Sequence, residues 1–172
     1  MRNVLKISLF AVAFMVCGAS SLFAQKFAYI NRSELVTAMP ERDSAEKKMI
    51  AFQNDLQSQL EAIQVEFNNK YQDFQKASGT LSDAVRQLKE KELRDLQSRF
   101  DEFQMTAQQD LQKMQDQLMS PVIARANEAI AKISKSNGYA AVFDLSSDAT
   151  AYIDQETLTN LLPMVKKELG IK

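Results

Sequence analysis

Two long runs of helical apolar periodicity constrain this chain more than any other feature of its sequence. Between residues 42 and 118, apolar side chains recur at steps of three and four residues, with one interruption at residues 77–80. This spacing places them on one face of an α-helix. The pattern repeats every eleven residues, which predicts nearly straight helices or a slight right-handed supercoil. We call the following residues the arm seam: Met49, Phe52, Leu56, Leu60, Ile63 and Phe67 in the first run, and Phe100, Phe103, Leu111 and Met114 in the second.

The two runs predict an antiparallel helical hairpin whose arms are each about 50 Å long. Its turn lies at Gly79 and Thr80, where Gly79 suits a left-handed helix end and Thr80, with Asp83, suits the cap of the second arm. Folding at this point requires that facing residues have numbers that add up to 159 or 160. The predicted facing pairs include Phe74 with Val85, Tyr71 with Leu88, Ile63 with Leu96 and Leu56 with Phe103. One pair, Phe67 with Glu92, fits poorly.

The first 24 residues have the pattern of a secretory signal peptide. Arg2 and Lys6 precede an apolar run from residue 7 to 17, and cleavage is predicted between Ala24 and Gln25. The run is too short for a spanning helix, which needs roughly 20 residues. A lipoprotein cysteine at position 17 is disfavoured, because the bulky Val16 precedes it. We therefore predict an exported protein.

Removal of this segment leaves 19 basic and 22 acidic residues, with no cysteine and no histidine. The sequence pI is about 5.6. Without disulfides, an exported chain must be stabilised by packing or by association. A thin hairpin buries little surface, so the sequence favours oligomerisation.

The segments on both sides of the hairpin predict a small body. Residues 26–30 are expected to form a strand, followed by a short helix capped by Asn31 and a break at Pro40. The second arm should end or bend at Pro121. The apolar periodicity that follows predicts a further helical segment, which should end at Asn137 and Gly138.

Beyond that point, residues 139–145 and 149–153 are predicted to be strands. Asp154 is predicted to cap a last helix that Pro163 kinks or splits. The fold is thus mainly α with a small β body. Residues 1–24 are the signal peptide, residues 25–41 and 119–172 the body, and residues 42–118 a hairpin arm inserted into it.

The mature sequence resembles the Skp/OmpH-like family of periplasmic chaperones over essentially its whole length. The resemblance is carried by residues 26–31, by Met39-Pro40-Glu41 and by the blocks at residues 138–144 and 151–154. It implies a homotrimer whose strands assemble a central body, from which three hairpins project like tentacles around a cavity. It also implies an ATP-independent holdase for unfolded outer-membrane proteins. The acidic pI argues against binding of lipopolysaccharide or of acidic membranes.

Other functions find little support in the sequence. Nucleophilic catalysis of the Ser-His or Cys-His type, and most zinc sites, need side chains that the mature chain lacks. The sequence also contains no Gly-rich phosphate loop. From these observations together we expect no enzymatic activity, no cofactor and no metal. Residues 42–118 hold 11 basic and 14 acidic residues, which disfavours nucleic acid. A structural coiled-coil protein of the cell envelope remains the alternative.

Client contacts are expected where apolar residues lie off the arm seam or near its tip. Scattered surface residues or body contacts are an equally good interpretation of several of them. The candidate client-binding residues are Ile50, Val65, Tyr71, Phe74, Leu93, Met105 and Met119. The candidate residues of the trimer body are Phe27, Tyr29, Val142, Phe143, Leu145 and Tyr152.

Overall fold

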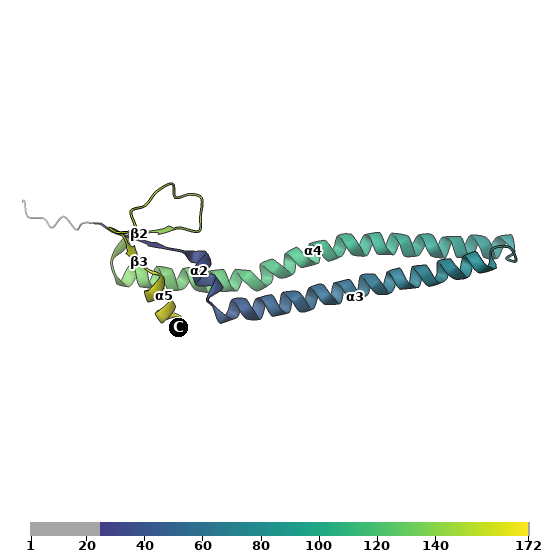
Figure 1. Cartoon of the computed structure of the whole chain (residues 1–172), viewed down its shortest axis with the longest axis horizontal. Coiled ribbons are helices and arrows are strands. Elements are labelled where there is room, and N and C mark those ends of the chain that lie inside the picture. Colours follow the sequence, from purple (N-terminus) through teal and green to yellow (C-terminus); the bar gives the residue numbers. More distant parts are fainter. Residues whose placement is uncertain (1–24, 172) are drawn as a thin grey trace, which may run out of the picture.

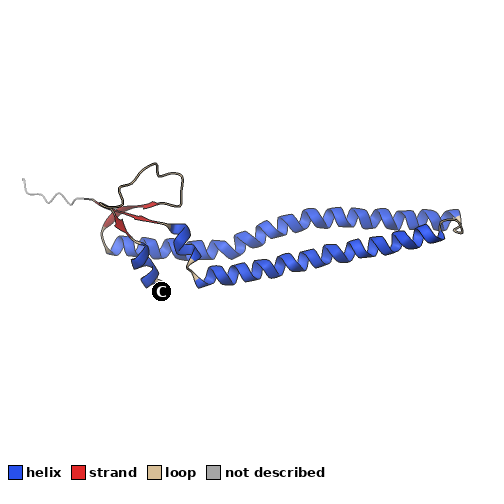
Figure 2. Cartoon of the chain, in the orientation of Figure 1, coloured by secondary structure: helices blue, strands red, loops and turns tan. Residues whose placement is uncertain are grey.

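The structure, a computed structural model, describes residues 25–171; the predicted signal peptide lies outside them. A long arm of two helices extends from a small body, and all strands lie in the body (Figures 1 and 2). The elements are β1 (Lys26–Ile30), α2 (Arg32–Thr37), α3 (Pro40–Ala77), α4 (Asp83–Ser136), β2 (Tyr139–Asp144), β3 (Thr159–Asn160) and α5 (Leu162–Glu168).

Strands from both ends of the described chain form one parallel sheet in the order β2-β1-β3. Ala28 lies beside Val142, and Tyr29 lies beside Phe143. Parallel neighbours need a crossover connection, and here the whole α3–α4 hairpin is part of the crossover between β1 and β2. The prediction of a hairpin inserted into a strand-based body is confirmed.

The core of the body lies between one face of this sheet and helices α2, α4 and α5. Ile30 of β1, Leu35 of α2, Ala126 of α4 and Val165 of α5 all belong to it and are almost completely buried. Because side chains alternate along a strand, Phe27 and Tyr29 project to the opposite face. Within residues 25–171, helices α2, α4 and α5 pack on the core face of the sheet and leave Phe27 of the outer face exposed.

The connection from β1 to the arm follows the sequence prediction. The side chain of Asn31 accepts a hydrogen bond of 3.0 Å from the amide of Glu34 and caps α2. Helix α3 then begins at Pro40, where a proline has no amide hydrogen to leave unpaired. Met39, directly before it, is completely buried and anchors the corner between α2 and α3.

Helix α4 belongs to both the arm and the body. It runs without interruption for 54 residues, about 80 Å, so of the two outcomes predicted at Pro121, an end or a bend, the end does not occur. Pro121 cannot donate a helical hydrogen bond, and Figure 1 shows α4 changing direction near its label. Beyond Pro121, Val122 and Ala126 enter the body core. The helix ends before Gly138, which has a φ of 73° and forms the predicted left-handed end.

The turn of the hairpin differs from the prediction in its details. Among residues 25–171, Gly79 is not one of the glycines with positive φ. The cap of α4 is Ser82, whose hydroxyl accepts from the amide of Val85 at 3.4 Å. Thr80, the predicted cap, instead donates its hydroxyl to the carbonyl of Ala77 at 2.9 Å. Thr80 thus serves the end of α3, and the connection is longer than a turn centred on residues 79 and 80.

The register of the hairpin is also different from the prediction. Glu66 pairs with Arg99 at 3.8 Å, although the predicted register puts residue 93 or 94 opposite Glu66. Ile63 and Phe103 line the same hollow between the helices, although the prediction paired Phe103 with Leu56. A stripe with steps of three and four residues packs almost equally well when shifted by one or two turns. Apolar periodicity alone therefore does not fix the register.

The new register removes the mismatch noted in the sequence. Near the tip, Lys70 Nζ lies 3.2 Å from a carboxylate oxygen of Glu92. Phe67, which the prediction placed against Glu92, stacks on Tyr71 of its own helix, with ring centroids 6.0 Å apart. Charged pairs at the edges of the seam thus supply information on register that its apolar residues lack.

Three predictions for the C-terminal segment are wrong. Residues 149–153 form no strand, and the edge of β1 that β2 leaves free pairs with β3 instead. Asp154 closes a local turn, accepting from the amide of Glu156 at 3.0 Å, and caps no helix. The last helix begins only at Leu162, after Asn160 has accepted from the Leu162 amide. Pro163 therefore lies in the first turn of α5 and does not kink it.

Candidate functional site

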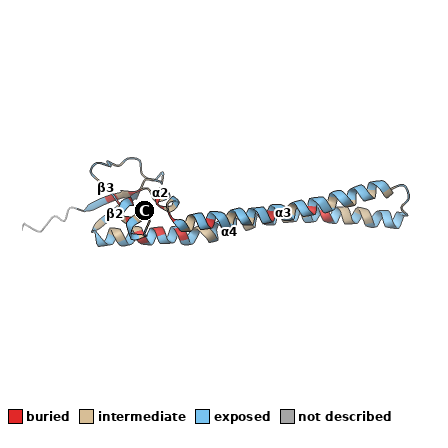
Figure 3. Cartoon of the chain, turned by 60° about the horizontal axis from the view of Figure 1, so that its bottom comes forward, coloured by how far each residue is buried: buried red, intermediate tan, exposed pale blue. Residues whose placement is uncertain are grey.

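The arm seam lies between α3 and α4. Leu56, Ile63, Leu96 and Ala107 are buried there, and Figure 3 shows that most of the remaining arm surface is exposed. The other seam residues are half-buried: Met49, Phe52, Leu60, Phe67, Phe100, Phe103, Leu111 and Met114. These side chains are occupied by contacts within the hairpin.

The candidate client-binding residues differ in their exposure. Ile50, Val65 and Met105 are 50%, 56% and 60% exposed, and Tyr71 is also exposed. Phe74, Leu93 and Met119 are half-buried. The first group is free to contact another molecule with most of its side-chain surface.

Two of these residues come together in a groove near the base of the arm. Ile50 of α3 and Met119 of α4 line the same hollow of about 430 Å³. The apolar residues Met49 and Leu118 and the charged residues Arg42 and Glu46 also line it. We call this hollow the methionine groove. Methionine side chains are flexible and polarizable, which suits contact with varied apolar partners.

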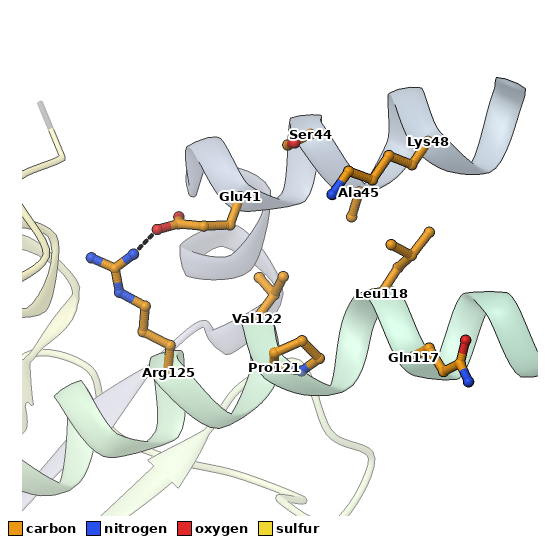
Figure 4. A pocket seen from close by; sticks show the side chains of 9 residues that line it. All are labelled: Glu41, Ser44, Ala45, Lys48, Gln117, Leu118, Pro121, Val122 and Arg125. Atoms are coloured by element: carbon orange, nitrogen blue, oxygen red, sulfur yellow. Dashed lines mark ion pairs between the residues drawn. The ribbon is translucent and has the colours of Figure 1, made fainter.

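A second groove of about 450 Å³ lies at the base of the hairpin (Figure 4). In it, Glu41 of α3 and Arg125 of α4 point toward one another and form an ion pair. Ala45 and Leu118 line both grooves and lie between them. The ion pair joins α3 to α4 at the base of the hairpin.

The other candidates do not join the methionine groove. Val65 lies midway between the seam residues Ile63 and Phe67, so at 100° per residue it projects away from α4. Met105 occupies the corresponding position between Phe103 and Ala107 and projects away from α3. The exposed candidates therefore lie on several sides of the arm and form no single pocket.

Two apolar residues near the tip were missed as candidates. Val85 and Leu88 are 40% and 57% exposed, whereas the sequence paired them with Phe74 and Tyr71 across the hairpin. Both residues continue the stripe of the second arm toward the tip in steps of three and four, and the one available signal is the polar Glu92 between them and Leu96.

The outer face of the sheet holds three of the six candidate trimer residues: Phe27, Tyr29 and Phe143. Phe27 and Phe143 contact each other with ring centroids 6.1 Å apart, and both are more than one-third exposed. Tyr152, in the loop after β2, is 82% exposed, and Tyr29 and Leu145 are half-buried. Val142 packs against the core of its own chain instead. An apolar face of this kind, next to unpaired strand edges, is unusual for a monomer.

A carboxylate fixes the end of β2 beside this face. Asp144 accepts from the amides of Arg32 at 3.2 Å and Ser146 at 2.9 Å, and from the Ser146 hydroxyl at 2.7 Å. Its other oxygen lies 3.1 Å from Arg32 Nε. Partial burial raises the pKa of Asp144, but the hydrogen bonds and the charge of Arg32 outweigh that effect and lower the pKa below 3.8. The network ties β2 to the beginning of α2.

Comparison with known proteins assigns this architecture. The profile of the outer membrane protein (OmpH-like) family matches residues 26–169. The chain belongs to the OmpH-like family. It is similar to the chaperone protein Skp of Photorhabdus laumondii subsp. laumondii, with 25% identity over 91% of this chain and 93% of the relative. The chaperone protein Skp of Pectobacterium atrosepticum is 22% identical over 88% of this chain and 92% of the relative.

The OmpH-like fold is also seen in a solved structure. A chain from Caulobacter crescentus CB15 matches with a TM-score of 0.72 over 84% of this chain and 83% of that chain, at 10% identity. At this identity, the structural match supports the fold alone. No helix within residues 25–171 has the length and hydropathy to cross a membrane. Within the same residues, no three acidic side chains gather as a metal site would require.

Proposed function

We propose that this protein is an ATP-independent holdase chaperone that binds unfolded outer-membrane proteins in the periplasm. The observation that carries the proposal is the exposure of large apolar side chains along an arm that stands clear of the body. Ile50, Val65, Leu88 and Met105 are each at least half exposed. Many separate apolar contacts suit weak, adaptable capture of unfolded chains.

The relatives support this proposal. Two proteins that match over nearly their whole length carry the name chaperone protein Skp. Export to the periplasm is supported by the signal-peptide pattern of residues 1–24. The absence of a Gly-rich phosphate loop from the sequence agrees with a function that needs no nucleotide.

A homotrimer would give the outer face of the sheet a partner. Phe27, Phe143 and Tyr152 are exposed in the single chain, and burial of such side chains is a main source of interface stability. Three copies joined through their bodies would place three arms around a cavity. A client would then be held there by many weak contacts, with the arms adapting to its size, and a tighter-binding acceptor would release it.

An aggregation assay tests the holdase function. An unfolded β-barrel outer-membrane protein is diluted from urea with and without the purified protein, and light scattering is followed. We expect suppression at one trimer per client. If a correctly folded protein leaves aggregation unchanged at this ratio, the proposal is wrong and a structural coiled-coil protein of the envelope becomes the better interpretation.

Two double variants show which arm surface matters. Ile50→Gln with Met119→Gln changes the methionine groove, and Val65→Gln with Met105→Gln changes the surfaces that project away from the seam. All four residues lie outside the seam, so the helical circular dichroism signal should be unchanged. Weaker suppression by either variant supports capture through exposed apolar residues.

The assembly is tested by mass. Light scattering at micromolar concentration should give three times the chain mass, and Phe143→Asp should shift the mass toward one chain because it puts a charge into the proposed interface. A monomer mass for the unchanged protein would exclude the trimer. It would not contradict the holdase function, which the aggregation assay tests separately.

A further inference from the structure

The charges of the arm are segregated along its length. Between Lys48 and Lys70 helix α3 has no basic residue, and between Arg99 and Arg125 helix α4 has only Lys113. These two stretches face each other, because Glu66 pairs with Arg99 at one end and Met49 and Leu118 share a groove at the other. They hold seven carboxylates, which we call the acidic belt: Asp55, Glu61, Glu66, Asp101, Glu102, Asp110 and Asp116.

The belt sets the sign of the charge of the described chain. Residues 25–171 contain 18 basic and 22 acidic residues, of which one basic and seven acidic residues lie in the belt stretches. The remainder therefore has 17 basic and 15 acidic residues and is slightly positive. The belt is a local negative region on an otherwise nearly balanced molecule.

Most carboxylates of the belt keep their charge uncompensated. Within residues 25–171, Glu66 is the only one of them with an ion-pair partner, the exposed Arg99. Glutamine amides one turn away donate to four others: Gln59 to Asp55, Gln57 to Glu61, Gln97 to Asp101 and Gln112 to Asp116, at 2.9–3.2 Å. A neutral amide orients a carboxylate without cancelling its charge.

The same stretches carry the exposed apolar surface of the middle arm. The methionine groove, with Ile50 and Met119, lies at the lower end of the belt. Val65 and Met105 lie within the two stretches that carry the acidic belt, and they are 56% and 60% exposed. An extended segment that fills the groove and continues along the outer side of either helix therefore meets one of these apolar side chains and negative charge together.

We propose that the occupant of the methionine groove and of the belt beside it is an unfolded polypeptide segment of net positive charge, with apolar side chains interspersed with Lys or Arg. The inference rests on the proposed holdase function and adds the class of client that the arm selects. Complementary charge speeds association and disfavours partners of like charge. Because the belt is exposed, its effect should decay over about 8 Å at physiological ionic strength and weaken as salt is added.

Three synthetic peptides test the selection of charge. They are unstructured, fluorescently labelled, 40 residues long and identical in their apolar positions, and carry Lys, Glu or Gln at the remaining positions. Binding to the purified protein is measured by fluorescence anisotropy at 50 mM and 300 mM NaCl. We expect the Lys peptide to bind about tenfold more tightly than the Glu peptide at 50 mM, with the Gln peptide between them, and the difference to shrink at 300 mM.

Two variants with the same change in net charge locate the effect. The belt variant combines Glu61→Gln, Asp101→Asn, Glu102→Gln and Asp110→Asn. The control variant combines Asp43→Asn, Asp73→Asn, Asp95→Asn and Glu128→Gln. The belt variant should lose most of the preference for the Lys peptide, and the control should keep it, while both retain the helical content of the original protein.

The outcomes separate this inference from the function on which it rests. Capture of an unfolded β-barrel protein together with equal binding of the Lys and Glu peptides would overturn the charge selection alone. An equal loss of preference in both variants would also overturn it, because total charge and not the belt would then be responsible. If neither the peptides nor the β-barrel protein binds, both proposals fail.

Discussion

In the body, side chains from a sheet and three helices meet in one core, whereas in the arm two helices touch along a single line. Leu35, Leu161 and Val165 of the body have no measurable exposure, and each is enclosed from several sides. In the arm, even the best-buried seam residues, such as Leu56 and Ile63, retain some exposure and have one partner helix. The body therefore depends on contacts distant in sequence, and the arm depends largely on local helix formation.

This difference has a functional consequence. A hairpin with a thin seam leaves most of each helix exposed, so its surface is available for other contacts. The two parts nevertheless share one helix, because α4 continues from the arm into the body core through Val122 and Ala126.

Truncation of a buried leucine should be far more costly in the body than in the arm. Leu35→Ala should lower the free energy of unfolding by about 3 to 4 kcal/mol, because the enclosed core cannot collapse into the cavity. Leu96→Ala, in the seam, should cost about 1 to 2 kcal/mol, because two helices can move together and water already reaches the site. Equal losses would contradict the distinction between core and seam.

Urea unfolding followed by circular dichroism measures both variants. One protein concentration must be used throughout, because association shifts apparent stability. Hydrogen exchange adds a second readout. Leu96→Ala should accelerate exchange only in the arm, whereas Leu35→Ala should accelerate it throughout the body.

Asp144 provides a test that is specific to the body and depends on pH. Asp144→Asn should destabilise the protein by about 1 to 2 kcal/mol at pH 7, because it weakens charge-assisted bonds to Ser146 and Arg32. The folded-state pKa of Asp144 is lowered below 3.8, so its contribution is fully present above that value. It is lost as the pH falls through the folded-state pKa.

The difference between Asp144→Asn and the original protein should therefore shrink when urea unfolding is repeated at acidic pH. Asp148→Asn, in the exposed loop that follows, is the matched control and should have little effect at either pH. A difference that stays constant into the acid range would show that the carboxylate charge is not what stabilises this junction.

The sequence predicted the helices of the arm well but missed part of the body. Steps of three and four residues are a local signal, so they located both arms, and Asn31 and Pro40 marked the beginnings of α2 and α3 correctly. A strand, in contrast, exists only if a partner edge is available. Residues 149–153 have the composition of a strand, yet β1 pairs with Thr159–Asn160 instead.

The candidate site was predictable only in part, for a similar reason. Periodicity separated Val65 and Met105 from the seam without knowledge of the fold. That Ile50 and Met119 share one groove depends on the register, which a repeated stripe leaves open. Uncompensated carboxylates on the arm are visible in the sequence, but their facing arrangement requires the structure.

The cap of α4 tests the turn with a small effect. Ser82→Ala should speed hydrogen exchange of the Val85 amide several-fold, because the hydroxyl that accepts from it is lost. The expected cost is only about 0.5 kcal/mol, since the bond is long and exposed. Thr80→Ala is the matched control and should leave that amide unchanged. The opposite result would restore Thr80 as the cap.

The register of the hairpin can be measured by cross-linking, independently of any effect on stability. Phe103→Cys is combined with Ile63→Cys in one variant and with Leu56→Cys in another, and residues 25–171 contain no native cysteine that would interfere. The structure places residues 63 and 103 on the same hollow, while position 56 lies seven residues, about 10 Å, along α3. A short bismaleimide linker should therefore join 63 to 103 much faster within one chain. Faster linkage of 56 to 103 would return the arm to the register that apolar periodicity suggested and would remove the facing arrangement of the acidic belt.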